Sequence, residues 1–214
     1  MTEPQTDILP DAMLDIETLG TGRDAAIISV GALRFNREWS TLAGAREFYK
    51  VVRLDGYVGV IDPATVLWWM KQEAAAREPI FGEVAQIQAS ELYQVLGGLQ
   101  LFLAGQGRSN MAERLWSNGP MFDERIVREA GQRLGLALGT HYRAERCMRN
   151  VYDDAELFFG KDNAREVLRI AELNRVPIEA KLLPKHHALG DCYVQAAHLL
   201  AVHEFKKELT RGAS

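Results

Sequence analysis

Acidic side chains are the residues of this chain whose types and spacing most clearly suggest chemistry. Asp15 and Glu17 lie two positions apart in a segment that is typical of a strand. Residues two apart in a strand point to the same face, so we expect the two carboxylates to converge. The neighbouring residues 12–14 and 27–28 are apolar, and charge at the edge of a buried sheet is costly unless a cation pairs with it. The alternative is an ordinary acidic pair on a solvated face.

Two further segments carry groups of the same kind. Asp123 follows the turn Gly119-Pro120 and begins a predicted helix, where the helix dipole favours an anion. Asp191 falls in the first turn of the last predicted helix, and His186 precedes it on a loop, where an imidazole can move and titrate. Taken singly, a first-turn aspartate or a histidine packed against a helix start is ordinary.

Together these four carboxylates and one histidine form an oxygen-rich set of potential ligands. No cysteine or histidine cluster at zinc spacing accompanies them, so the set suits hard Mg²⁺ or Mn²⁺ better than zinc. Two such ions about 3.5–4 Å apart can clamp the attacking and leaving oxygens of an in-line phosphoryl displacement. A histidine can take the proton of the attacking water near neutral pH. The set is compatible with hydrolysis of a phosphodiester.

The order of these residues resembles the three motifs of the DEDD-type 3′–5′ exonucleases of the histidine subclass, which have the ribonuclease H-like, DnaQ-like fold. The resemblance extends from residue 11 to about residue 203. It implies two metal ions, one held by Asp15, Glu17 and Asp191 and the second reached by Asp15 and Asp123. All four acids would thus be both metal ligands and catalytic residues.

The same resemblance assigns the general base and part of the substrate site. His186 would be the base, and its spacing to Asp191 favours it over His187, which departs from the usual family pattern. Thr18 and Leu19 would meet the sugar of the terminal nucleotide. Phe122, directly before the third acid, is also placed among the substrate-binding residues.

A tryptophan pair marks the predicted helix 64–77. Trp68, Trp69 and Gln72 resemble the Trp-Trp-x-x-Gln helix of the branch that holds a mycobacterial-type exoribonuclease and phage exonucleases. Adjacent helical residues point about 100° apart, so we expect one indole to be partly open. An open indole could stack on a base for roughly 1–3 kcal/mol, and Gln72 could add a hydrogen bond. Packing in the core is the alternative.

The elements that must position these residues predict an α/β fold. Early strands at 11–17, 27–35 and 47–54 predict an antiparallel meander, and a short strand at 114–118 and an extended segment at 141–149 follow later. Helices are predicted at 64–77, 83–103, 121–134, 150–159, 163–173 and 188–207. This order favours a layered α/β fold with a mixed sheet. The family resemblance implies that this fold is a ribonuclease H-like mixed β-sheet flanked by helices. We expect an N-terminal extension at 1–10, a single exonuclease domain at 11–207 and a C-terminal tail at 208–214.

Composition is that of an ordinary globular chain. Its 214 residues suit about one domain, and the net charge of −4 argues against a protein that coats nucleic acid electrostatically. Basic residues are dispersed, and Arg23 and Lys185 are those we expect nearest to phosphate. Without a membrane-length apolar run or a secretory signal, we expect a cytoplasmic protein with no membrane partner. Cys147 and Cys192 are expected to be buried thiols.

The predicted function is a two-metal 3′–5′ exonuclease. It would act on single-stranded RNA or DNA 3′ ends, with RNA slightly favoured, and release nucleoside 5′-monophosphates. The alternative is a catalytically silent module of the same fold that binds nucleic-acid ends or serves as a scaffold. A homodimer is possible by resemblance.

Overall fold

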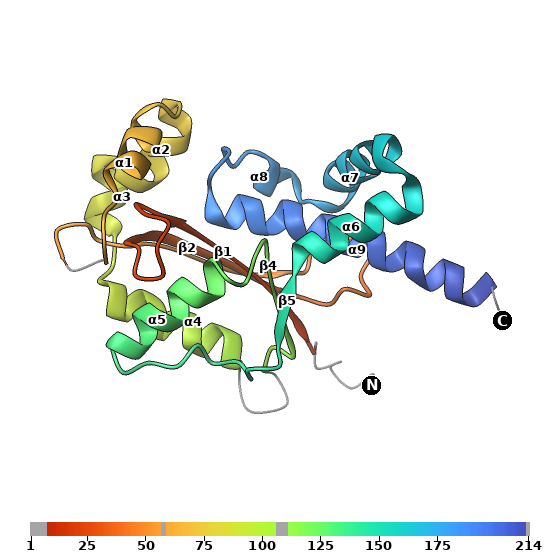
Figure 1. The fold of residues 1–214 in the computed structure, drawn as a ribbon, viewed down its shortest axis with the longest axis horizontal. Helices are drawn as coiled ribbons and strands as arrows, with labels where there is room; N and C mark the ends of the chain where they lie inside the picture. Colours follow the sequence, from red (N-terminus) through yellow and green to blue (C-terminus); the bar gives the residue numbers. More distant parts are fainter. Residues whose placement is uncertain (1–7, 57–58, 106–110, 213–214) are drawn as a thin grey trace, which may run out of the picture.

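The computed structural model describes residues 8–56, 59–105 and 111–212. Residues 1–7 of the predicted N-terminal extension and residues 213–214 of the predicted tail lie outside it. Five strands form one sheet in the order β3-β2-β1-β4-β5 (Figure 1). Their bounds are β1 Asp11–Thr18, β2 Ile27–Phe35, β3 Arg46–Val51, β4 Arg114–Ser117 and β5 Glu145–Cys147.

The sheet is mixed, as predicted. β2 pairs antiparallel with both β1 and β3, whereas β4 is parallel to β1 and β5 is parallel to β4. The first three strands are therefore the expected meander, and β1 lies in the centre of the sheet. A central strand is covered on both faces, which explains why every residue of β1 and β2 outside the acidic pair is buried.

Helices cover both faces of the sheet, while α1–α3 form a lobe beside it (Figure 1). Their bounds are α1 Pro63–Met70, α2 Ala74–Phe81, α3 Glu83–Gln88, α4 Leu92–Ala104, α5 Asp123–Arg133, α6 Met148–Phe159, α7 Lys161–Arg175, α8 Ile178–Lys181 and α9 Ala188–Gly212. Alternate residues of β1 serve two cores. Ala12, Leu14 and Ile16 pack with α4 and α5, whereas Met13 packs with α6 and α9. Asp15 and Glu17 share the face of Met13 and so point to the side of α9.

The predicted helix 64–77 is two helices, which is a correction to the sequence analysis. Trp69 contacts Phe81, with ring centroids 5.4 Å apart. In one straight helix those residues would lie about 18 Å apart along the axis, at 1.5 Å per residue. A break at 71–73 lets α2 fold back over Trp69, and the side chain of Gln72 donates to the carbonyl of Trp68 at 3.1 Å. The break therefore serves a tertiary contact that helical periodicity does not reveal.

The predicted helix 83–103 is also divided. Ser90 leaves the helical path and bridges to Val52 just after β3. Glu91 and Gln94 then form a capping box that starts α4. At the other end of the chain, α9 continues to Gly212 rather than ending at Lys207, and the single-turn helix α8 was not predicted.

Two remaining expectations concern the cysteines and membranes. Cys147 and Cys192 are both free thiols; Cys192 is buried and Cys147 only partly so. Within the described residues, no helix combines the length and apolarity that crossing a membrane requires.

Candidate active site

Strand β1 places the acidic pair at the edge of the α9 layer. Asp15 lies opposite Gly31 of β2, and Glu17 lies opposite Ser29. The register shifts directly after Glu17, one residue before the strand ends at Thr18. Both carboxylates therefore stand on one face at the end of the central strand, as their spacing predicts.

Gly31 lets the start of α9 approach this face. A Cβ at this position would lie 2.3 Å from the carbonyl carbon of Ala188 and 2.4 Å from the nitrogen of Leu189. Only a residue without a side chain permits this backbone contact, which brings the first turn of α9, with Asp191, onto the sheet beside Asp15. The sequence analysis missed Gly31, although a glycine inside an otherwise apolar strand is a recognisable signal of close backbone approach.

His186 and Asp191 meet Glu17 at this contact. Each of the three offers one ligand atom, and these atoms all lie within 4.8 Å of one another. Among the described residues, His186 is the only non-glycine residue with a positive φ, at 61°. Its ring packs edge-on against Trp68, with centroids 4.9 Å apart. A left-handed backbone costs about 1–3 kcal/mol in a residue of this kind, so the surrounding contacts hold His186 there.

Asp123 reaches the same strand from the start of α5. Its carboxylate accepts a hydrogen bond from the backbone N–H of Ile16 at 3.3 Å, and its side chain is buried. The preceding Gly119 has φ +124°, a conformation that favours glycine and turns the chain sharply from β4 towards α5. Asp123 therefore reaches β1 from α5 and lies outside the group that Glu17 and Asp191 form with His186.

Gln195 is a second residue that the sequence analysis missed. It lies one turn after Asp191 on α9, and its amide donates to the carboxylate of Asp15 at 3.1 Å. The side chain is buried, and its own Oε1 has no hydrogen-bond partner in the described structure. This contact fixes one oxygen of Asp15. No sequence pattern marks it, because a glutamine on a long helix is common.

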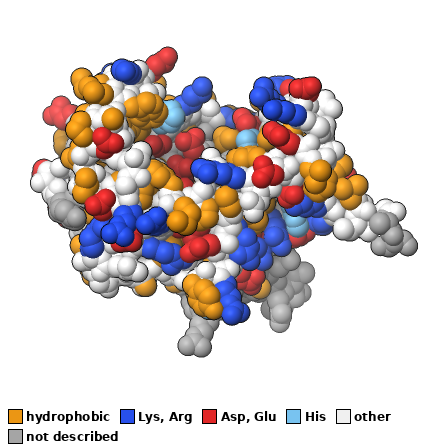
Figure 2. All heavy atoms as spheres, in the orientation of Figure 1, with side chains coloured by type: hydrophobic (Ala, Val, Ile, Leu, Met, Phe, Trp, Pro, Cys, Tyr) orange, Lys and Arg blue, Asp and Glu red, His pale blue; other side chains and the backbone are white. Residues whose placement is uncertain are grey.

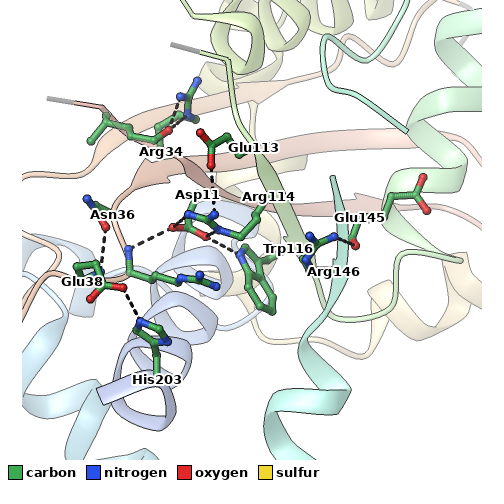
Figure 3. Close-up of polar contacts among 12 residues, drawn as sticks. Asp11, Arg34, Asn36, Glu38, Glu113, Arg114, Trp116, Glu145, Arg146 and His203 are labelled. Carbon is green, nitrogen blue, oxygen red and sulfur yellow. Dashed lines mark hydrogen bonds and ion pairs between the residues drawn. The ribbon is translucent and has the colours of Figure 1, made fainter. Parts of the chain in front are cut away.

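The four site acids differ from Asp11, a further buried acid that lies on the same strand and face as Asp15 and Glu17. Asp11 accepts hydrogen bonds from Arg114 at 2.6 and 3.0 Å and from the indole of Trp116 at 2.9 Å (Figure 3). By contrast, no Lys or Arg nitrogen lies within 4.0 Å of the four site carboxylates among the residues the structure describes. Figure 2 shows acidic side chains gathered in a hollow at the centre of one face. The cluster is therefore built without the protein cation that Asp11 has.

Burial and mutual repulsion change the protonation of the cluster. Burial, followed by the charges of Asp123, Asp191 and Glu17, raises the pKa of Asp15 well above its usual value. Burial and the charges of Asp191 and Asp123 raise the pKa of Glu17 to about 9. Burial also raises the pKa of Asp123 to about 7, partly opposed by the N–H of Ile16, and raises that of Asp191. A cation is what would let these carboxylates ionise together at neutral pH.

The donor set fits a hard divalent cation. Carboxylate oxygens predominate, one imidazole stands at the edge, and neither cysteine belongs to the group Glu17, His186 and Asp191. The residues that would hold such ions are Asp15, Glu17, Asp123 and Asp191.

The tryptophan pair is divided between core and surface. Trp69 is 3% exposed, and its indole N–H donates to the carbonyl of Thr18 at 2.9 Å, which ties α1 to the loop after Glu17. Trp68 is 41% exposed and contacts His186. The expectation that one indole is partly open is confirmed, and Trp68 is the one that faces the site.

The other predicted substrate residues are less accessible. Leu19 is buried in the core, and the hydroxyl of buried Thr18 donates to the carbonyl of Gly20 at 2.6 Å. Phe122 is half-buried and packs against the core next to α5, and the amide of Gln72 is engaged by Trp68. The structure thus brings Trp68 to the acids and leaves the side chains of Thr18 and Leu19 largely enclosed.

His187 is separated from the cluster although it adjoins His186. Its ring stacks on Tyr49 with centroids 4.1 Å apart, and its Nδ1 accepts from the N–H of Gly190 at 3.4 Å. The side chain is buried, and burial lowers its pKa. These contacts secure the loop that carries His186. Of the two expected phosphate contacts, Arg23 is exposed, and Lys185 lines a cavity of about 300 Å³ beside Asp191.

The fold and this set of acids with one histidine define a domain of the DEDDh 3′–5′ exonuclease class. In sequence, the model of the 3′–5′ exoribonuclease Rv2179c-like domain matches residues 10–203. The chain belongs to this family, and it is a metal-dependent exonuclease domain. Comparison with curated protein sequences gives no match.

Solved structures share the fold at low identity. The E. coli exonuclease I complex with single-stranded DNA has a TM-score of 0.59 at 13% identity, over 94% of this chain and 42% of that one. The nuclease domain of 3′hExo, a DEDDh family member bound to rAMP, has a TM-score of 0.56 at 13% identity, over 95% of both chains. Exonuclease X in complex with 5′ overhanging duplex DNA has a TM-score of 0.53 at 18% identity, over 92% of this chain and 93% of that one. The chain spans about two fifths of the exonuclease I chain.

Proposed function

We propose that this protein removes nucleotides from the 3′ ends of single-stranded RNA and releases nucleoside 5′-monophosphates, with two Mg²⁺ or Mn²⁺ ions. The observation that carries the proposal is the convergence of four carboxylates beside His186, with no Lys or Arg nitrogen within 4.0 Å of them among the described residues. These carboxylates are those of Asp15, Glu17, Asp123 and Asp191. The family description as an exoribonuclease supports RNA over DNA.

In this proposal the ions would be held by the four carboxylates and would supply positive charge for the phosphate and activation of water. His186 would take the proton of the attacking water at its imidazole, and its contact with Trp68 would hold the ring in position. Gln195 would keep one oxygen of Asp15 oriented. The partly exposed indole of Trp68 would stack on the terminal base.

The experiment is a shortening assay with single-stranded RNA and DNA labelled at the 5′ end. Stepwise shortening with Mg²⁺ or Mn²⁺ that EDTA abolishes is expected, with RNA the faster polymer and mononucleotides as products. Asp191→Asn should abolish it while the circular dichroism spectrum stays native, and Asp153→Asn on the exposed side of α6 is the matched control.

The same assay tests the alternative of a silent binding module. Tight binding of RNA ends without shortening under any metal would favour that module and refute the proposal. Turnover retained by Asp191→Asn would refute the assignment of the site. Homodimerisation stays a prediction from the family resemblance.

A further inference from the structure

Three arginines follow one another at intervals of three, just before β5, in β5 and at the start of α6, and their side chains have different contacts. Arg146 donates to the carbonyls of Arg143 and Glu145 at 2.8 and 2.7 Å. Arg143 lies over the ring of Tyr142 and donates to its hydroxyl at 2.9 Å. Arg149 is exposed, and within the described residues it has neither an ion pair nor a side-chain hydrogen bond. Of the three, it is the one whose guanidinium makes no hydrogen bond within the described residues.

The guanidinium of Arg149 lies at the turn that carries Asp123. A Cβ on Gly119 would lie 3.2 Å from its Nη2 and 3.4 Å from its Cζ, so the group packs against the backbone of this glycine. Its charge also acts on Asp123 and lowers the pKa of that carboxyl against the effect of burial. A cation is thus held at the edge of the acidic cluster without being paired within it.

This edge is a different part of the cluster from the one where His186 lies. The histidine stands with Glu17 and Asp191 under α9, whereas Asp123 enters from α5. In an in-line displacement the leaving oxygen departs opposite the attacking water. For a 3′–5′ exonuclease, the leaving group is the shortened strand. With His186 as the base, the strand that stays bound would then pass Asp123 and Arg149, which lie outside the group that holds His186.

We infer that Arg149 binds the nucleic-acid strand through the phosphate immediately upstream of the scissile one. This inference rests on the proposed function and extends it to a contact that the family motifs do not include. A guanidinium presents paired donors that match phosphate oxygens. On a chain of net charge −4 with four acids at its centre, such a cation also offsets repulsion of the incoming polyanion.

The test compares Arg149→Ala with Arg143→Ala, an equal charge change on the neighbouring segment. The first substrate is a single-stranded decaribonucleotide, and removal of its terminal nucleotide is measured. The second is the p-nitrophenyl ester of a nucleoside 5′-monophosphate, which has a scissile ester and no upstream phosphate. We expect Arg149→Ala to raise KM for the decamer about tenfold, to reduce the salt dependence of binding by about 0.7 in the logarithmic slope, and to leave the ester unchanged. Arg143→Ala should leave the cleavage of both substrates unchanged.

A neutral linkage locates the contact. Replacing the phosphate upstream of the scissile one by a methylphosphonate should raise the KM of the wild type for the decamer about tenfold. The same replacement should not raise the KM of Arg149→Ala any further. An equal loss of activity on the decamer and on the ester would overturn the inference, because Arg149 would then act through Asp123. An unchanged decamer KM, or an additional loss with the methylphosphonate, would overturn it too. A wild type that shortens no strand would instead refute the proposed function, and the two failures are therefore distinguishable.

Discussion

Replacing Glu17 by glutamine should make the metal-free protein more stable, by an amount that grows with pH. Glu17 lies in the acidic cluster, and burial with the charges of Asp191 and Asp123 raises its pKa from 4.5 to about 9. The folded protein therefore holds a proton that the unfolded chain releases. A folded-state pKa above the unfolded value stabilises below the unfolded pKa, and that stability is lost as pH rises towards the folded pKa.

The magnitude follows from linkage. Each pH unit between the two pKa values costs the folded wild type about 1.4 kcal/mol relative to an amide, which does not titrate. The expected gain of Glu17→Gln is near zero at pH 4.5 and at most about 4 kcal/mol at pH 7.5. Since Glu17 is partly exposed, solvent screening reduces this figure, and we expect about 2–4 kcal/mol at pH 7.5.

The assay is urea denaturation in EDTA at pH 5.5, 6.5, 7.5 and 8.5. Glu156→Gln, at an exposed position of α6, is the matched control and should show no such trend. With Mg²⁺ in place of EDTA, the wild type should recover stability relative to Glu17→Gln, because a bound cation stabilises the folded state and displaces protons. If the difference in the free energy of unfolding between Glu17→Gln and the wild type does not grow with pH, the reasoning that folding raises the pKa of Glu17 is refuted.

Five other substitutions separate packing from function. Gly31→Ala should destabilise the fold by about 1–3 kcal/mol and lower kcat, since α9 must move from the sheet; a thermal melt and activity unchanged from wild type would contradict this. Trp69→Ala should cost about 3–5 kcal/mol in denaturation, whereas Trp68→Ala should leave stability within about 1 kcal/mol and raise KM about tenfold or more. His186→Ala should lower kcat by about 10²- to 10⁴-fold without lowering Tm, whereas His187→Ala should mainly lower Tm; the reverse pattern would exchange their roles.

Local patterns predicted the mixed α/β sheet and the positions of the candidate acids on the strands and helices. Alternation along β1 places Asp15 and Glu17 on one face, and this follows from the period of a strand whatever the partner. Strand runs separated by turns likewise predict the meander, because a short connection leaves antiparallel pairing as the ready solution. First-turn positions for Asp123 and Asp191 follow from helix-start signals in the same way.

Contacts between distant segments decided what the sequence left open. Helical periodicity cannot tell Trp68 from Trp69, and only the carbonyl of Thr18 and the ring of Phe81 assign one indole to the core. The same contact breaks a helix that the sequence presents as continuous.

The choice between the two adjacent histidines has the same origin. The ring of His187 stacks on Tyr49 of β3, whereas His186 lies with the acids Glu17 and Asp191. Gly31 and Gln195 acquire their roles only where α9 lies on β1 and β2. Residue type and spacing determined which groups could do chemistry, whereas packing of segments more than a hundred residues apart determined which of them meet, because those contacts leave no periodic trace in the chain.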